Sequence, residues 1–246
     1  MLCAILAGGL ATRMRPATDS VPKALLAVAG RPFADVQLGW LAEQGVDRVV
    51  YCIGHLGHQI RAHVGDGRRF GLDVTYSDEA DRRLGTAGAL RLAAERGLLA
   101  GRFLVLYGDS YLQIDVRAFW ERFEASGLSA AMSVFHNASA LERSNTRLDG
   151  DRVDLYRKGV ADPASLGLDH VDYGLLAFRL PTIARMVPAN TTLDLSTVQE
   201  QLSLARDLGA FVATRRYFEI GSPRGRLDLE AWLAHPGAHT VMEDVG

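Results

Sequence analysis

Short apolar runs alternate with amphipathic stretches through the first half of the chain. The apolar runs predict strands over LCAILA (2–7), DRVVYCIG (47–54), GLDVTYS (71–77) and GRFLVLYGDS (101–110). Between them, FADVQLGWLAEQG (33–45), residues 58–64 and TAGALRLAAERG (86–97) have helical spacing. Strands and helices that alternate at such short intervals predict βαβ units, and hence a parallel sheet that is covered by helices on both faces.

The second half of the chain has a different pattern. Strands are predicted over 128–137 and 170–180, and a hairpin over 147–159 that turns at Asp149-Gly150. Residues 197–210 (TVQEQLSLARDLGA) have helical spacing, residues 211–222 predict one or two strands, and a last helix begins near Pro223. Because no linker rich in glycine, serine or proline separates the halves, we expect one domain over 1–246, with functional halves at 1–127 and 128–246.

Composition excludes several classes of function. The formal net charge is −2 over 246 residues, so no overall field attracts nucleic acid or an acidic membrane, and a bound anion needs a local cationic cluster. No apolar run has the length of a membrane span, and the first residues lack the basic region of a secretory signal, so we expect a cytoplasmic protein. Cys3 and Cys52 are expected to be buried, reduced thiols. His55, His58 and His63 lack the partners and spacing of a zinc site.

A cationic loop follows the first predicted strand directly. The segment 5–32 (ILAGGLATRMRPATDSVPKALLAVAGRP) places Gly8 and Gly9 after the strand and then Arg13 and Lys23. In an open parallel sheet, ligands bind beyond the carboxyl ends of the strands. Glycines let backbone amides approach a phosphate closely, and the two cations supply charge. The pattern favours a phosphate-binding loop, although it matches neither G-x-G-x-x-G nor G-x-x-x-x-G-K-[ST], and a simple turn with solvated cations stays open.

Two carboxylates are candidate ligands for a metal ion. Asp109 follows Gly108 at the end of the predicted strand 101–110, and Glu219 leaves a strand in FEIGS. Mg²⁺ prefers oxygen ligands and keeps several waters, so one or two carboxylates with phosphate oxygens suffice. A turn or a helix cap is the alternative role for Asp109.

Several blocks of the sequence, in order, resemble the sugar-1-phosphate nucleotidylyltransferases. LAGGLATRMRP and VPKALLAVAGRPF are similar to that family's L-A-G-G-x-G-T-R-L-x-P and P-K-P-L-x-P-V-x-G-x-P patterns. The later blocks are LGTAGAL (84–90), LYGDS (106–110), YRKG (156–159), DYGLLAF (172–178) and FEIGSPRG (218–225). The resemblance extends over nearly the whole chain and is strongest with the short, single-domain branch of heptose-1-phosphate and mannose-1-phosphate guanylyltransferase-like enzymes.

This resemblance implies both a fold and an activity. The fold would be a Rossmann-like three-layer α/β/α domain of the nucleotide-diphospho-sugar transferase type, with a mixed, mostly parallel central sheet. The activity would be transfer of a nucleoside monophosphate from a nucleoside triphosphate to a sugar 1-phosphate, with release of pyrophosphate and with Mg²⁺ as cofactor. GTP with a heptose or mannose 1-phosphate is the favoured pair. Half 1–127 would bind the nucleotide and half 128–246 the sugar phosphate.

Positions that match the family blocks are expected to have the family's roles. Arg13, Lys23 and Asp109 would be catalytic, and Asp109 and Glu219 would bind Mg²⁺. The nucleotide-binding residues would be Leu6, Ala7, Gly8, Gly9, Gly85 and Thr86, and the sugar-phosphate-binding residues would be Lys158, Asp172 and Gly174. The start of the predicted helix at Gly85 would offer free backbone amides to a base or a sugar edge.

The chain departs from the family pattern at several positions. Ala11 stands where glycine is usual, Ala24 where proline is common, and Glu219 where aspartate is usual. Arg157 takes a place often held by glutamate, and Asp172-Tyr173 replaces the common pair of asparagine and a small residue. The last two changes put the family's sugar contacts in doubt for this chain.

Other functions stay open at this point. The alternatives are UTP- or CTP-dependent transfer, transfer to a pterin or to phosphocholine, and a catalytically silent relative that binds sugar nucleotides. A nicotinamide dehydrogenase is disfavoured because its glycine fingerprint is missing. The sequence indicates no nucleic-acid or membrane partner, and it leaves the oligomeric state open, a homo-oligomer included.

Overall fold

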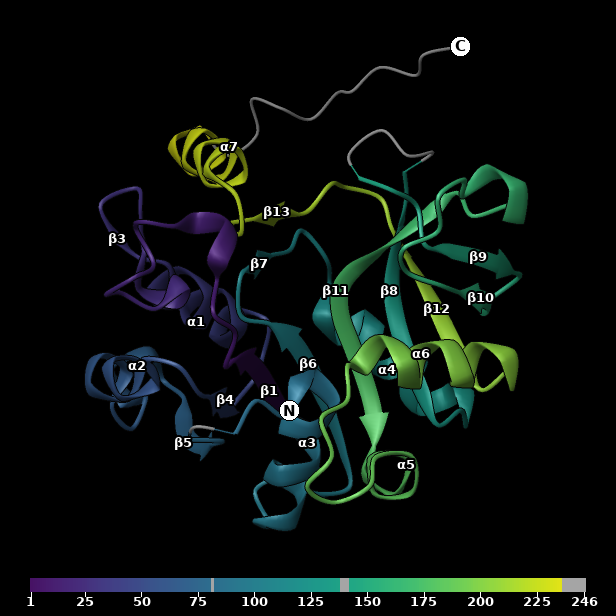
Figure 1. Cartoon of the computed structure of the whole chain (residues 1–246), viewed down its shortest axis with the longest axis horizontal. Helices are drawn as coiled ribbons and strands as arrows, with labels where there is room; N and C mark the ends of the chain where they lie inside the picture. Colours follow the sequence, from purple (N-terminus) through teal and green to yellow (C-terminus); the bar gives the residue numbers. More distant parts are fainter. Residues whose placement is uncertain (81, 138–141, 236–246) are drawn as a thin grey trace.

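A computed structural model describes residues 1–80, 82–137 and 142–235, and these residues form a nine-stranded sheet in the order β5-β4-β1-β6-β11-β8-β12-β10-β9 (Figure 1). Its strands are β1 (Leu2–Ala7), β4 (Arg48–Ile53), β5 (Asp73–Asp78), β6 (Arg102–Tyr107), β8 (Ala130–His136), β9 (Thr146–Asp149), β10 (Arg152–Tyr156), β11 (His170–Arg179) and β12 (Leu208–Ala213). Two short pairs form separate sheets: β2 (Ala27–Val28) with β3 (Arg31–Pro32), and β7 (Ser110–Tyr111) with β13 (Phe218–Glu219).

Strand direction divides the large sheet into two parts. β5, β4, β1 and β6 are parallel to one another. β11 is antiparallel to β6 and to β8, β12 is parallel to β8, and β10 is antiparallel to both β12 and β9. The expected α/β fold with a mixed sheet is therefore confirmed, and parallel pairing is concentrated in the first half of the chain.

Helices cover both faces of the sheet. They are α1 (Phe33–Glu43), α2 (Gly57–Val64), α3 (Gly85–Glu95), α4 (Val116–Ser126), α5 (Leu180–Met186), α6 (Leu195–Leu204) and α7 (Pro223–Ala234). On one face, α1, α2 and α4 contribute Leu38, Ile60 and Phe119 to a buried core. On the other face, α3 and α6 contribute Leu90 and Val198 to a second core. The two cores on opposite faces make the three-layer α/β/α arrangement (Figure 1).

Helix α7 packs outside these layers and brings the end of the chain back to the first half. Phe218, Ile220 and Leu229 form a small buried cluster with Phe33 and Val36 of α1. The Ser222 side chain caps α7 by accepting a hydrogen bond from the backbone N–H of residue 225, and a proline occupies the first turn. This packing holds β13 against β7, directly after Asp109.

Most predicted elements are present, and the largest boundary error is at the end of a predicted helix. The predicted hairpin is present as β9–β10, but it turns at Gly150-Asp151, one position later than expected, because Asp149 pairs with Arg152. Both cysteines are buried free thiols, as expected. The helix predicted over 197–210 ends at Leu204, and its last residues belong to β12, which pairs with β8 from Leu208 onward. Ladder hydrogen bonds to a buried neighbouring strand outweigh the local helical spacing there. No helix among the described residues is both long and apolar enough to cross a bilayer.

Candidate active site

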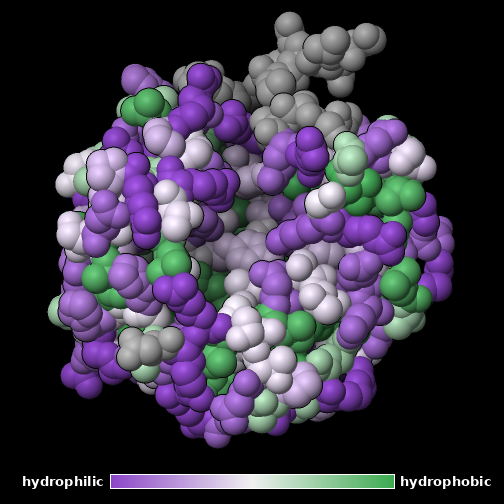
Figure 2. All heavy atoms as spheres, viewed as in Figure 1, coloured by the Kyte–Doolittle hydropathy of each residue, from purple (hydrophilic) through white to green (hydrophobic). Residues whose placement is uncertain are grey.

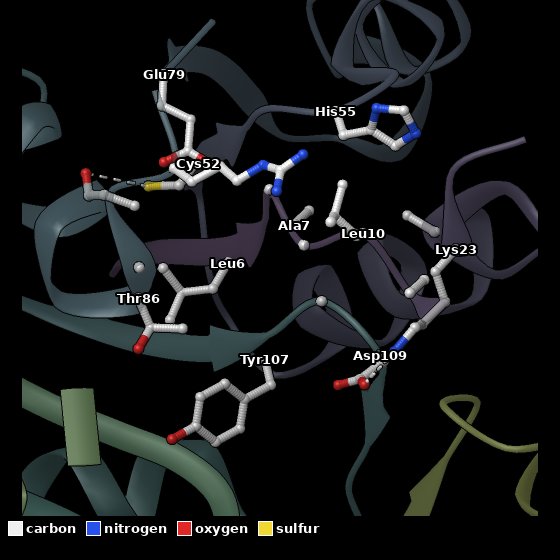
Figure 3. A pocket seen from close by; sticks show the side chains of 18 of the residues that line it. Leu6, Ala7, Leu10, Lys23, Cys52, His55, Glu79, Thr86, Tyr107 and Asp109 are labelled. Carbon is white, nitrogen blue, oxygen red and sulfur yellow. Dashed lines mark hydrogen bonds and ion pairs between the residues drawn. The ribbon is translucent and has the colours of Figure 1, made fainter. Parts of the chain in front are cut away.

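A cavity of about 560 Å³ opens at the carboxyl ends of β1, β4 and β6. Figure 2 shows the surrounding face hollowed near its middle and rimmed largely by hydrophilic residues. The cavity wall includes all six residues predicted to bind the nucleotide, together with two of the predicted catalytic residues: Leu6, Ala7, Gly8, Gly9, Gly85, Thr86, Lys23 and Asp109 (Figure 3). Parallel strands place the loops that follow them at one edge, so residues far apart in the sequence line a single cavity.

The glycine loop after β1 lies close to neighbouring backbone and side chains. A Cβ on Gly8 would stand 2.7 Å from Glu79 Oε1, whereas a Cβ on Gly9 would meet nothing within 4 Å. Ala11, where the family usually has glycine, has a left-handed φ of 48°. Its carbonyl accepts hydrogen bonds from the Met14 N–H at 3.0 Å and from Thr18 Oγ1 at 2.9 Å. These contacts stabilise the loop in a conformation that is unfavourable for an alanine.

Lys23 and Asp109 form an ion pair in the cavity wall. The Lys23 Nζ donates to Asp109 Oδ2 at 2.9 Å, and both side chains are mostly shielded, with 20% and 26% exposure (Figure 3). Asp109 follows β6 through Gly108, where a Cβ would stand 2.6 Å from the Leu6 carbonyl oxygen. Only glycine therefore lets β6 leave the sheet this close to β1. The Ile220 N–H donates to the Asp109 carbonyl at 2.9 Å and ties this turn to β13.

Arg13, Asp109 and Glu219 converge on one point. A Cβ on Gly221 would stand 2.5 Å from Glu219 Oε2, 3.1 Å from Arg13 Nη2 and 3.2 Å from Asp109 Oδ2. We call this position the Gly221 point. Strand β13 brings Glu219 there because it pairs antiparallel with β7, with Glu219 opposite Ser110. The Glu219 carboxylate accepts from the Gly221 N–H and from Ser222 Oγ, each at 2.5 Å.

The two carboxylates at the Gly221 point fit a divalent cation. Asp109 Oδ2 and Glu219 Oε2 both lie within 3.2 Å of where a Cβ on Gly221 would stand, so the two carboxylate oxygens are close to each other. Within the described ranges, no group of three or more histidine, cysteine, aspartate or glutamate side chains is arranged to hold a metal. The protein would thus supply two oxygen ligands, and phosphate oxygens and water would complete the shell, as Mg²⁺ prefers.

The start of α3 is less open than expected. The N–H groups of Ala87 and Gly88 both donate to the Leu193 carbonyl oxygen, at 3.0 and 3.3 Å. Thr86 Oγ1 accepts from the Leu195 N–H at 2.7 Å. The expectation of free amides at this helix start was therefore wrong for residues 87 and 88, because a loop from the second half already satisfies them. Gly85 and Thr86 still line the cavity.

Asp194, which caps α6, lies beside this contact. Burial opposes its ionisation, but hydrogen bonds from Ser196 and Thr86 and the Lys158 charge outweigh it and lower the pKa of Asp194. Lys158 itself lies with its Nζ 5.9 Å from the centre of the Tyr107 ring. The predicted sugar-phosphate lysine is thus placed next to a residue of the cavity wall.

Asp172 and Gly174 lie beneath the cavity wall and not on it. Asp172 is 9% exposed, and its carboxylate accepts hydrogen bonds from Tyr107, Tyr156, Gln199 and the Gly174 N–H. A direct contact of Asp172 with a sugar phosphate stays a prediction, since internal donors already surround its oxygens. Gly174 has a φ of 105°, which only glycine adopts without strain.

Several cavity residues were missed from the sequence. Glu79, at the carboxyl end of β5, is 8% exposed, and burial raises its pKa above the usual range of a glutamate. Its Oε2 accepts from the Leu84 N–H at 3.1 Å. Arg83, His55, Tyr107 and Cys52 also line the cavity. The Cys52 thiol stays protonated and uncharged at neutral pH, because burial raises its pKa to about 12. Glu79 follows a predicted parallel strand, and this position could have identified it as a cavity residue from the sequence.

Comparison with known proteins agrees with this geometry. A family model described as "Nucleotidyl transferase" matches residues 3–144, which is more than half of the chain. The chain belongs to the nucleotidyl transferase family. The match covers the glycine loop, Lys23, the start of α3 and Asp109, whereas Lys158 and Glu219 lie beyond it.

Similar proteins include one curated relative and two solved structures. The N-acetylmuramate alpha-1-phosphate uridylyltransferase of Neisseria meningitidis is 41% identical over 122 residues, which are 49% of this chain and 52% of that protein, so the chain spans about half of this relative. HddC from Yersinia pseudotuberculosis, in complex with GMP-PN, has a TM-score of 0.75 and 22% identity over 94% of this chain and 99% of that one. The inositol-1-phosphate CTP transferase of T. maritima has a TM-score of 0.74 and 19% identity over 95% and 96%.

Proposed function

We propose that the protein transfers a nucleoside monophosphate from a nucleoside triphosphate to a sugar 1-phosphate and releases pyrophosphate. One observation carries the proposal: Arg13, Asp109 and Glu219 meet at the Gly221 point, and Lys23 contacts Asp109 there, beside a cavity of about 560 Å³. Two cations and two carboxylates at the rim of such a cavity suit a polyphosphate held with a divalent cation.

The chemistry needs positioning and charge neutralisation. The attacking oxygen of a sugar phosphate is already ionised at neutral pH, so the site needs no general base. Arg13 would bind the leaving pyrophosphate, Lys23 the triphosphate near its α-phosphorus, and Lys158 the incoming sugar phosphate. Mg²⁺, held by Asp109 and Glu219, would neutralise charge on the reacting phosphates. Half 1–127 would bind the nucleotide, and half 128–246 the sugar phosphate.

Glu79 favours a base with N–H donors on its pairing edge. Its buried carboxylate lines the cavity next to Gly8 and can accept hydrogen bonds there. Guanine presents two adjacent donors on that edge, uracil presents one between two carbonyl groups, and the ring nitrogen of cytosine is an acceptor there. We therefore favour GTP as the donor. The resemblance to the heptose and mannose branch favours a heptose or mannose 1-phosphate as the acceptor.

UTP is the second candidate. The relative that is 41% identical over 122 residues is named a uridylyltransferase. The two candidates share every phosphate contact, so the difference between them depends on the base contacts of Glu79 and its neighbours.

A matrix of nucleoside triphosphates against sugar 1-phosphates, assayed by released pyrophosphate, tests the proposal. We expect release only when both substrates are present, with GTP as the best donor, and we expect Glu79→Gln to narrow the preference for GTP over CTP. Nucleotide binding without pyrophosphate release from any pair would instead support a catalytically silent relative. Release with UTP alone would assign the second candidate.

A further inference from the structure

One oxygen atom of Asp109 accepts a hydrogen bond from Lys23 and also lies near Glu219. Asp109 Oδ2 accepts the Lys23 Nζ hydrogen bond at 2.9 Å, and the same Oδ2 lies 3.2 Å from the Gly221 point. The ammonium group therefore sits on the Asp109 oxygen that lies near Glu219 Oε2, which is the oxygen that a divalent cation held by both carboxylates would use. Both side chains are shielded by the protein, so water screens this ion pair only partly.

Glu219 is held in a different way. Its two oxygens accept hydrogen bonds from the Gly221 N–H and from the Ser222 hydroxyl, which are neutral donors. Among the described residues no cation lies within ion-pair distance of Glu219, and Arg13 makes no ion pair with either carboxylate. Of the two candidate metal ligands, only Asp109 is thus neutralised by a cation of the protein itself.

We infer that Lys23 takes the place of the divalent cation on Asp109 until the triphosphate binds. This inference rests on the proposed function and deepens it. An ammonium and a divalent cation on one carboxylate oxygen repel each other, and a neutralised carboxylate attracts a cation weakly. The metal ion therefore binds poorly to the nucleotide-free protein.

Binding of the triphosphate would draw Lys23 away from Asp109 and so free this carboxylate for the cation. The triphosphate offers Lys23 several anionic oxygens in exchange for one carboxylate, and the flexible four-carbon stem of lysine lets the ammonium move to them. It also brings its own oxygen ligands for the cation. The divalent cation and the nucleotide consequently bind together, and a free cation does not preload the site.

Mn²⁺ titration monitored by electron paramagnetic resonance, without nucleotide, tests this inference. We expect Lys23→Met to bind Mn²⁺ at least about tenfold more tightly than the wild type, because it frees Asp109 Oδ2. Lys158→Met is the matched control: it removes the same charge next to Tyr107 and is expected to change Mn²⁺ affinity less than twofold. Asp109→Asn in the Lys23→Met background should abolish the gain. Lys23→Gln is a second uncharged replacement and should give the same gain in Mn²⁺ affinity. Thermal melting of each variant checks that it is folded.

Two results would overturn the inference. The first is wild-type Mn²⁺ affinity within twofold of that of Lys23→Met and Lys23→Gln when both variants are folded. The second is a gain that survives loss of the Asp109 carboxylate. Pyrophosphate release from the wild type is measured separately. A wild type that turns over and also binds free Mn²⁺ as tightly as the variants refutes only this inference, whereas absence of release with every substrate pair refutes the proposed function.

Discussion

Replacing Gly221 with alanine adds one methyl group at the point where three functional side chains converge. The new Cβ would stand 2.5 Å from Glu219 Oε2, and real Cβ atoms essentially never approach a neighbour within 3.0 Å. The Glu219 carboxylate must therefore retreat by about half an ångström. Because the φ of Gly221 is not in the left-handed region, the backbone itself tolerates alanine. The substitution thus perturbs the charged groups and leaves the chain path intact.

The expected loss of kcat/KM follows from the hydrogen bonds that the Glu219 carboxylate would lose. A hydrogen bond to a charged group contributes roughly 1.5–3 kcal/mol, and losing one in the transition state lowers kcat/KM by about 10- to 100-fold. The Glu219 carboxylate makes two such bonds and also faces Asp109 and Arg13. We expect a loss toward the upper end of this range, with little change in the urea midpoint.

The assay is pyrophosphate release with the best substrate pair, alongside urea unfolding. Gly39→Ala is the matched control, because Gly39 lies inside α1 and its added Cβ would meet nothing within 4 Å. This control should keep full activity and raise the free energy of unfolding by roughly 0.5–1 kcal/mol. A Gly221→Ala enzyme that is folded and retains kcat/KM within threefold of wild type would refute the convergence argument.

Three further predictions concern the cavity and its walls. Lys23→Ala and Asp109→Ala should unfold like wild type in urea yet lose at least about 10²-fold in pyrophosphate release, and near-wild-type turnover of either would contradict its role. Gly85→Ala, with φ +71° and a Cβ 2.6 Å from the Leu193 carbonyl, should lower the free energy of unfolding by more than about 1 kcal/mol; an unchanged urea midpoint would count against this contact. The pKa of Asp194 is lowered, so its stabilisation is present at neutral pH and is lost as pH falls below 3.8 through the folded-state pKa. Asp194→Asn should therefore be less stable at pH 7 and lose less stability on acidification, and parallel pH profiles of the two proteins would exclude this.

The alternation of strands and helices could be predicted because it depends on local patterns. Period-2 and period-3.6 spacing of apolar residues is visible in any window of the chain, and it predicted β1, β4, β5 and β6 with their intervening helices. The same local reasoning failed at residues 205–210. From Leu208 onward the chain pairs with β8, which lies about eighty positions earlier, and no local pattern contains that partner.

The rim of the active site could also be anticipated in part. Parallel strands end at one edge of a sheet, so Gly8, Lys23 and Asp109 were expected near one another, and all three line the cavity. Glu79 could have been found by the same rule, since it follows β5. Glu219 was expected as a metal ligand from its place after a predicted strand and from the family resemblance, but its position next to Asp109 comes from the pairing of β13 with β7.

The sequence by itself determined the α/β fold class, the cationic loop after β1 and the identity of the residues available for phosphate chemistry. These properties depend on residue type and on short-range spacing. Only the tertiary structure decided which groups are free to act. It showed that Leu193 occupies two amides of α3, that internal donors surround Asp172, and that Lys23 pairs with Asp109. Each of these facts depends on a hydrogen-bond partner distant in sequence, and only folding brings such partners within 3.5 Å of each other.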